Sequence, residues 1–499
     1  MTKKVTNKTY LAIFLAICLI ICLIPSVFMI FFPSEETIGN ERQTIWPSVV
    51  TEDGALNSRI LPEMGAYFES HYAFRPQLIT ADARLQASLF QVSNTDPVIV
   101  GQDGWLYYSS TLKDYRGSDP LSDRGMWNLA HNVALIQNYV QAMGAKFLFM
   151  VPPNKNSLYP EQMPYYYGVR ESKESNLSRL ASYLEDAGVR YLDVAGALES
   201  QEEILYLKED SHWNEKGAMM VYDLALDMLE KEHETWELVP GGGREGDLGN
   251  MIYPAEHSEE PDDAIDMQPQ YDFIPNPSSS DPVSVEDFQI ETDNPAASET
   301  LLMYRDSFGN TLIPLFSNAF AHSYYDRSAN YLMAKAIQQY QPQYVVLELV
   351  ERNLSNLVSK PAVIPAPRRN PDPETIRALP QVQTTIERSR SDANFVEFSG
   401  AVPEEDVAEH GKIYLQITMP DGTAGIYEAF TVTAPDPAEA GGLTYLQDPS
   451  GNPGTEGGQN PDYGYLLYLP LTQFGTIEDA QASQVEIYAE ESTDEVETD

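Results

Sequence analysis

The stretch "TLLMYRDSFGN" (residues 300–310) joins an apolar segment to a polar turn. Residues 300–304 are typical of a buried strand, and a polar Arg-Asp-Ser turn ending at Ser307 follows directly, with Gly309 two residues later. Ligands and catalytic groups of α/β proteins gather at the carboxyl ends of strands. We therefore expect Ser307 at such a strand end, beside backbone N–H groups that can stabilise an oxyanion.

Helix and strand signals alternate on both sides of this stretch. Apolar residues at helical spacing predict helices over residues 126–144, 174–188, 214–232 and 330–340. Short apolar runs predict further strands over residues 145–151, 189–194 and 344–350. This alternation favours a mostly parallel α/β sheet covered by helices on both faces.

Composition and period divide the chain into parts. Residues 98–108 predict two short strands around an Asp-Gly turn, and apolar residues at period two in the C-terminal part predict a small, sandwich-like β domain. The predicted parts are a polar region with short helical stretches (34–95), the α/β domain (96–358) with an acidic surface insertion (238–298), a Pro-rich linker (359–384), the β domain (385–490) and a disordered acidic tail (491–499).

The N-terminus carries a targeting signal in residues 1–33. Three lysines precede an uncharged apolar run of 23 residues, Tyr10 to Phe32, which is long enough to cross a bilayer. The order of charges predicts a single-pass anchor in the cell membrane, with the N-terminus cytoplasmic and the main domains outside. A cleaved signal peptide is the alternative, although no small-x-small cleavage site follows the run. Both cysteines, Cys18 and Cys22, lie inside it, so we expect no disulfide in the outer part.

Charge and composition exclude several function classes. The formal net charge of −44 makes nucleic acid binding improbable, because phosphate backbones would be repelled. The seven histidines show no metal-ligand spacing. The "GGGREG" segment (241–246) has no helix signature after it, which argues against a phosphate-binding loop. We therefore expect no metal and no cofactor.

The stretch "KEDSHWNEKGA" (208–218) places Asp210 two residues before His212. A catalytic serine needs an imidazole beside it and a carboxylate that fixes the imidazole tautomer. Asp210, His212 and Ser307 therefore form a candidate triad. The structural alternative is a helix N-terminus packed by Trp213.

These motifs resemble a known family. "DSHWNEKGA" followed later by "YRDSFGN" is similar to the SGNH-hydrolase-like domains of alginate O-acetyltransferases, the AlgX/AlgJ type or DHHW group, in which the serine motif follows the Asp/His motif. "VGQDGWLYY", "VPPNKNSLYPEQMP", "GDLGNM" and "YVVLELVERNL" resemble other segments of that group in the same order, over residues 95–355. The resemblance implies a flavodoxin-like, circularly permuted, three-layer domain.

The resemblance also implies a reaction. It is the transfer of an acetyl group to hydroxyls of a cell-surface or secreted polysaccharide, outside the cytoplasm. Ser307 would carry the acetyl group, His212 would act as the general base and Asp210 would orient His212. The acetyl donor in such systems is a multi-pass membrane acyltransferase of the MBOAT type, and the N-terminal anchor would hold this chain beside it.

Three further residues are expected to line the site. Arg305 stands where the family's serine motif has glycine, and we expect it to point into the same cleft. Asn154 and Lys155 follow the predicted strand 145–151 and are our candidates for substrate or oxyanion contacts; the alternative is a polar loop after Pro152-Pro153.

Two other functions remain open at this point. A carbohydrate acetylesterase would use the same triad and pass the acetyl group to water. A non-catalytic glycan-binding scaffold of an export complex would not depend on Ser307.

Overall fold

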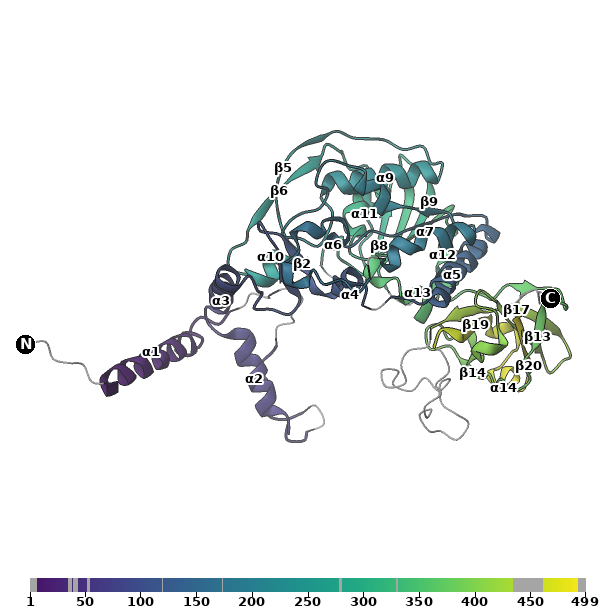
Figure 1. Ribbon diagram of the computed structural model, residues 1–499, viewed down its shortest axis with the longest axis horizontal. Helices are drawn as coiled ribbons and strands as arrows, with labels where there is room; N and C mark the ends of the chain where they lie inside the picture. The colour runs from purple at the N-terminus through teal and green to yellow at the C-terminus, as the bar shows by residue number, and fades with distance from the viewer. Residues whose placement is uncertain are drawn as a thin grey trace, which may run out of the picture.

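The computed structural model describes residues 7–34, 38, 44–51, 54–118, 120–172, 174–277, 281–328, 331–433 and 461–491. Figure 1 shows a helix, α1, that extends from one end of the molecule, a central α/β part, and a β-rich part at the other end. The predicted fold class, an α/β domain followed by an all-β domain, is confirmed.

Among the described residues, three helices precede the first strand. α1 (Asn7–Phe28) lies within the predicted apolar segment, and its residues Tyr10–Phe28 have a mean hydropathy of 3.0. Of the helices in the described ranges, it is the one long and apolar enough to cross a membrane. α2 (Ile60–His71) and α3 (Arg75–Phe90) occupy the region in which we expected only short helical stretches. Their length was underestimated because exposed apolar residues interrupt the usual two-sided pattern.

The central sheet has seven strands in the order β4-β3-β11-β9-β10-β8-β7. Its first five strands are parallel, and the last two form an antiparallel edge. The strands are β3 (Lys146–Met150), β4 (Tyr191–Leu192), β7 (Asp272–Phe273), β8 (Gln289–Asp293), β9 (Ser298–Tyr304), β10 (Phe320–Asp326) and β11 (Tyr344–Glu348).

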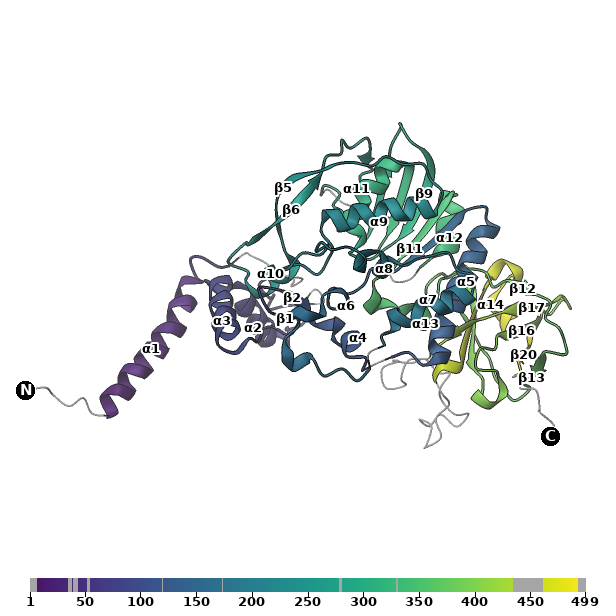
Figure 2. The ribbon, with the colours of Figure 1, turned by 45° about the horizontal axis from the view of Figure 1, so that its top comes forward.

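Helices cover both faces of this sheet (Figure 2). Side chains of a strand alternate between faces. Thus Phe147 and Phe149 of β3 enter one core, while Leu148 and Met150 enter the other. The first face is covered by α5 (Asp123–Ala142), α7 (Asn176–Asp186), α12 (Met333–Tyr340) and α13 (Asn356–Ser359). The second is covered by α8 (Val194–Glu199), α9 (Glu215–Met228) and α11 (Gly309–Ala319).

Short elements surround the amino-terminal half of this domain. Strands β1 (Val98–Val100) and β2 (Leu106–Tyr108) pair as predicted around the Asp103-Gly104 turn. Two short helices lie near them, α4 (Leu112–Arg116) and α6 (Lys155–Leu158).

The stretch 238–298, predicted as a surface insertion, contributes to the fold. It holds a hairpin of β5 (Leu238–Glu245) and β6 (Glu259–Ile265), the helix α10 (Asp247–Ile252) between them, and the sheet strands β7 and β8. α10 also follows the "GGGREG" segment, after which we predicted no helix. The acidic composition hid these strands, because an antiparallel strand with one exposed face needs only alternate buried residues, such as Ile290 and Thr292 of β8.

Two sheets form the C-terminal domain, in the orders β12-β17-β16-β20-β13 and β14-β15-β19-β18. A core between them includes Phe398, Leu415 and Leu467. The elements are β12 (Arg368–Arg369), β13 (Ile376–Ala378), β14 (Thr385–Arg388), β15 (Phe395–Ala401), β16 (Ile413–Thr418), β17 (Ala424–Glu428), β18 (Phe430–Val432), β19 (Gly464–Pro470), α14 (Ile477–Gln481) and β20 (Gln484–Glu490).

The predicted linker 359–384 is not a free connection. β12 and β13 lie within it and pair with strands of the C-terminal domain. Its residues Ala362, Val363 and Ile364 are buried in the core of the α/β domain. Prolines in this segment suggested a linker, but apolar residues between them pack on both domains. The predicted tail lies outside the described residues except for Glu491.

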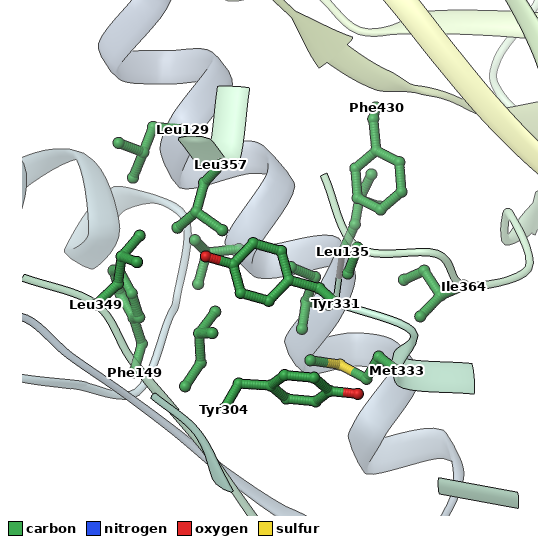
Figure 3. Packing of buried hydrophobic residues seen from close by; sticks show 14 of the residues in the cluster. Leu129, Leu135, Phe149, Tyr304, Tyr331, Met333, Leu349, Leu357, Ile364 and Phe430 are labelled. Carbon is green, nitrogen blue, oxygen red and sulfur yellow. The ribbon is translucent and has the colours of Figure 1, made fainter. Parts of the chain in front are cut away.

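The two domains share one apolar core. Phe430 of β18 and Ile364 belong to the same buried cluster as Leu129, Leu135 and Leu357 of the α/β domain (Figure 3). A buried asparagine of α5, Asn132, donates hydrogen bonds to the carbonyl oxygens of Leu357 and Thr431 and accepts one from the N–H of Thr431. Apolar and polar contacts therefore hold the β domain in one place against α5.

Candidate active site

Polar segments follow three neighbouring strands of the central sheet. β3 leads to Asn154, β9 leads to Ser307, and β11 leads to a short 3-10 helix (Glu351–Asn353). Because β3, β11 and β9 are parallel neighbours, their carboxyl ends lie at the same edge. The loop that precedes α9 reaches this edge, since its His212 contacts Ser307.

The structure brings together the three residues of the predicted triad. Nδ1 of His212 lies 2.7 Å from Oδ1 of Asp210, and Nε2 of His212 lies 2.8 Å from Oγ of Ser307. The same Asp210 oxygen accepts the backbone N–H of His212 at 2.8 Å. When Nδ1–H donates to the carboxylate, Nε2 is free to accept the serine hydroxyl proton, which is the arrangement a serine nucleophile requires. We call Asp210, His212 and Ser307 the relay.

Electrostatics within the relay oppose the effect of burial. Burial alone would raise the pKa of Asp210, but the hydrogen bond and charge of His212 hold that pKa well below its usual range. Burial alone would lower the pKa of His212, but the hydrogen bond to Asp210 and the charges of Asp210 and Asp247 raise it above 6.5. The site therefore stabilises an imidazolium, the form that arises when His212 takes a proton.

The structural alternative for this motif is present in the same residues. Asn214 caps α9 by accepting the N–H of Gly217 at 2.9 Å. Trp213 is fully buried and packs edge-on against Phe308, with ring centroids 5.0 Å apart. The His212 ring also packs against Phe308, with ring centroids 4.8 Å apart. Helix capping and aromatic packing thus fix the imidazole beside Ser307.

Lys155 contacts the loop that carries Asp210. Its ammonium is buried and lies 3.0, 2.8 and 2.5 Å from the carbonyl oxygens of Leu207, Lys208 and Asp210. Burial lowers the pKa of Lys155 to about 8. Its donors therefore hold the loop that carries Asp210, and the substrate or oxyanion contact stays a prediction.

Asn154 is likewise buried among protein groups. Its side chain donates to Oδ2 of Asp114 at 3.1 Å, and its backbone N–H donates to Oε2 of Glu351 at 2.9 Å. That Glu351 oxygen also accepts the hydroxyl of Ser157 at 2.6 Å. Burial raises the pKa of Glu351 to about 7. These contacts tie the segment after β3 to the segment after β11.

The buried side chain of Arg305 is held by protein groups. Its guanidinium donates to the carbonyl oxygens of Val285 and Asp287 at 2.9 and 2.7 Å, and it also contacts Asn310. The stem of Arg305 covers Gly309, where an added Cβ would lie 2.7 Å from Cδ of the arginine. The Arg-x-x-x-Gly spacing is therefore a packing requirement of the turn that presents Ser307.

Asp306 fixes the same turn. Its Oδ1 accepts the N–H of Phe308 at 2.9 Å, and its Oδ2 accepts the N–H of Val350 at 2.7 Å. Its own N–H donates to Oε2 of the fully buried Glu348 at 2.9 Å. Burial and the charge of Asp306 raise the pKa of Glu348 well above its usual range. α11 begins two residues after Ser307, so the positive end of its dipole lies beside the hydroxyl.

Asp247 joins the site although no motif in the sequence marks it as a site residue. Its Oδ2 accepts the Ser211 hydroxyl at 2.6 Å and lies 3.8 Å from Nδ1 of His212, and its N–H donates to Oδ2 of Asp210 at 3.1 Å. Burial and the charge of Asp210 raise the pKa of Asp247. An added Cβ at Gly246 would lie 2.2 Å from the Glu209 carbonyl oxygen, which explains the glycine of the "GDLGNM" segment.

Two further features bear on the chemistry of the site. The guanidinium of Arg352 lies 5.7 Å from the centre of the Phe308 ring and 5.6 Å from that of Tyr108, and its charge opposes the rise in the His212 pKa.

Asp210, His212 and Asp247 each offer one ligand atom, and these atoms lie within 4.8 Å of one another. A cation held there would compete with the proton that His212 shares with Asp210, so relay and metal binding are alternatives for these atoms.

Comparisons with known proteins match this domain. Residues 98–285 match the family described as the SGNH hydrolase-like domain of acetyltransferase AlgX. Over 179 residues the chain is 25% identical to the probable alginate O-acetylase AlgJ of Pseudomonas aeruginosa. The aligned segment covers 35% of this chain and 43% of that protein. The chain thus spans less than half the length of this relative. The family match includes Asp210 and His212 and ends before Ser307.

Similar solved structures include three with related names. A DHHW family protein from Eubacterium siraeum has 17% identity and a TM-score of 0.39, over 52% of this chain and 93% of that one. The O-acetyltransferase domain of Pseudomonas putida AlgJ has 17% identity and a TM-score of 0.35, over 52% and 91%. Pseudomonas aeruginosa AlgX has 11% identity and a TM-score of 0.36, over 80% and 96%.

The family match, the curated relative and the predicted motif order agree. The α/β domain of this chain is therefore similar to the AlgX/AlgJ-type SGNH-hydrolase-like proteins.

Proposed function

We propose that this chain is a membrane-anchored O-acetyltransferase that acetylates hydroxyls of a polysaccharide outside the cytoplasm through an acetyl-serine at Ser307. The observation that carries the proposal is the relay, in which Nε2 of His212 lies 2.8 Å from the serine hydroxyl. The family supports acyl transfer, because it is described by an acetyltransferase and the curated relative is named a probable alginate O-acetylase.

The reaction proceeds in two steps. Oγ of Ser307 attacks the acetyl carbonyl of the donor while Nε2 of His212 takes the hydroxyl proton. Asp210 stabilises the imidazolium that forms. The imidazolium then gives the proton to the donor's leaving group, which departs and leaves acetyl-serine. A sugar hydroxyl then gives its proton to Nε2 and attacks the acetyl-serine, and the proton returns to Oγ as Ser307 is released. The N-terminal N–H groups of α11 stabilise the oxyanion in both steps.

The anchor completes the proposal. α1 spans the membrane with the lysine-rich end in the cytoplasm, which puts the relay outside. A multi-pass MBOAT-type acyltransferase carries the acetyl group across the membrane and delivers it to Ser307. An acetylesterase would share the first step and differ in the second, where water replaces the sugar hydroxyl.

The test uses the full chain in detergent with a small activated acetyl ester, and it records intact mass with and without oligosaccharide. Wild type is compared with Ser307→Ala and with Ser182→Ala, an exposed serine on α7 that serves as the control. We expect an added acetyl group on wild type and the control only, and its passage to the sugar. Acetate release without acetylated sugar would establish the esterase. Equal inertness of wild type and Ser307→Ala would refute the acetyl-serine and favour a binding protein.

A further inference from the structure

Exposed apolar side chains are concentrated next to the proposed anchor. Twelve large apolar side chains are exposed between residues 45 and 90, whereas nine are exposed in all the described residues after residue 90. They include Trp46, which packs edge-on against Tyr67 and Phe68 of α2. Soluble proteins rarely expose apolar side chains in such density, and a patch of this kind marks a contact with a membrane or a partner.

α3 carries the most regular part of this surface. Pro76, Thr80 and Ala83 form its buried face. On the opposite face, at helical spacing, lie four exposed apolar side chains that we call the apolar stripe: Phe74, Leu78, Leu85 and Leu89, which are 46, 44, 56 and 64% exposed. A helix that buries one apolar face in its own protein and exposes another has a second contact to make.

The buried face of α3 is fixed to the α/β domain. The guanidinium of Arg84 pairs with Glu256 and lies 3.7 Å from the centre of the Tyr253 ring. The hydroxyl of Thr80 accepts the N–H of Ala255 at 3.0 Å. These contacts reach the segment directly after α10, so α3 is a rigid part of the domain and the direction of its stripe is set.

The stripe begins where the proposed span ends. Phe74 packs against Phe28, the last residue of α1, with ring centroids 5.6 Å apart. The N–H of Ser34 donates to the carbonyl oxygen of His71, which ties the chain after α1 to the end of α2. A surface that starts at the end of a membrane span is at the level of the lipid headgroups.

The charge of this region differs from that of the rest of the chain. Residues 45–90 contain three basic and five acidic side chains, in a protein with 31 basic and 75 acidic ones. One of the acids, Asp82, lies at the edge of the stripe and accepts hydrogen bonds from Gln86 and Asn94, which holds it beside the apolar residues. Low net charge next to a span favours contact with a bilayer surface, which a strongly acidic face would avoid.

We infer that α3 lies on the outer surface of the bilayer, with the stripe of Phe74, Leu78, Leu85 and Leu89 inserted among the lipid headgroups. This inference rests on the proposed membrane anchor. Interfacial helices bind by apolar side chains of this kind, which enter the boundary between headgroups and acyl chains. Because α3 is fixed to the segment after α10, the contact holds the relay close to the membrane, where a membrane-embedded donor presents its acetyl group.

The test uses the full chain in nanodiscs, with one fluorophore-labelled cysteine per variant and a quencher carried on the lipids. Leu85→Cys and Leu89→Cys, each in a Cys18→Ala, Cys22→Ala background, report on the stripe. Met143→Cys in the same background is the matched control, because this side chain is 54% exposed and lies at the end of α5. Cys18, kept alone with Cys22→Ala, reports on the anchor.

We expect the lipid-borne quencher to reduce emission at positions 18, 85 and 89 and to leave position 143 unchanged. Quenching at position 18 without quenching at 85 and 89 would overturn this inference and leave the anchor intact. No quenching at position 18 would overturn both. Disulfide cross-linking of Leu85→Cys between copies, without quenching, would assign the stripe to a second copy instead. Leu89→Cys lies in the last turn of α3, so it remains informative if the change at Leu85 disturbs folding.

Discussion

Replacing Asp210 with asparagine tests the relay without changing the size of the side chain. Both carboxylate oxygens of Asp210 accept N–H groups: Oδ1 accepts from His212, and Oδ2 accepts from the backbone of Asp247 at 3.1 Å. An amide places an NH2 group on one of these sides. If it faces Nδ1, His212 takes the tautomer with the proton on Nε2, which cannot accept the proton of Ser307.

The expected loss follows from this geometry. Without the correct tautomer and without a carboxylate beside the imidazolium, we expect kcat for acetyl release to fall by about 100- to 10,000-fold, or ~3 to 5 kcal/mol of activation free energy. The pH dependence should change as well. The base must be neutral, so activity rises as pH increases through the pKa of His212, which Asp210 raises. The midpoint of the pH–activity profile should therefore lie at lower pH in Asp210→Asn than in wild type.

The assay measures kcat and kcat/KM with a chromogenic acetyl ester between about pH 5 and 9. The control is Asp193→Asn, because Asp193 caps α8 by accepting the N–H of Gly196 at 3.0 Å, and asparagine also caps helices well. Activity of Asp210→Asn within about tenfold of wild type, with the same pH midpoint, would refute the role assigned to the relay.

Three further changes test the groups around the relay and between the domains. Asp247→Asn removes a charge 3.8 Å from Nδ1 of His212, so the midpoint of the pH–activity profile should fall by about one unit; an unchanged midpoint would contradict this. Lys155→Met leaves three carbonyl oxygens without their buried donor and should lower the free energy of unfolding by about 3 kcal/mol in urea titrations at neutral pH. Asn132→Ala removes the bonds to Leu357 and Thr431, so limited proteolysis should cut between the domains faster than in wild type.

The main features of the α/β domain follow from local patterns. The apolar runs at 145–151, 300–304 and 344–350 contain parallel strands that are almost entirely buried, and such strands have a nearly continuous apolar composition. The strand end before Ser307 then identifies the edge where polar groups meet. His212 and Ser307 are 95 residues apart in the chain. The expectation that polar groups collect at the carboxyl ends of strands, together with the family resemblance, predicts that these two residues meet.

Other features depend on contacts that no local pattern reveals. β8 and β10 each bury fewer than half of their residues and carry several polar side chains, so they resemble surface segments. A lysine after a strand is usually solvent-exposed, yet the ammonium of Lys155 meets three carbonyl oxygens of a loop that lies more than fifty residues later. Asp247 is 37 residues from Asp210 in the chain, and only the folded hairpin around α10 brings the two together.

α10 connects the two ends of the proposed mechanism. At its start, Asp247 contacts Asp210 and lies beside His212. Directly after its end, the segment from Tyr253 to Glu256 holds α3 through Arg84 and Thr80. A helix of six residues is too short to bend between these contacts, so the orientation of α3 and that of the relay are set together. A membrane contact through α3 would therefore fix both the height of Ser307 above the bilayer and the direction from which an acetyl donor approaches it.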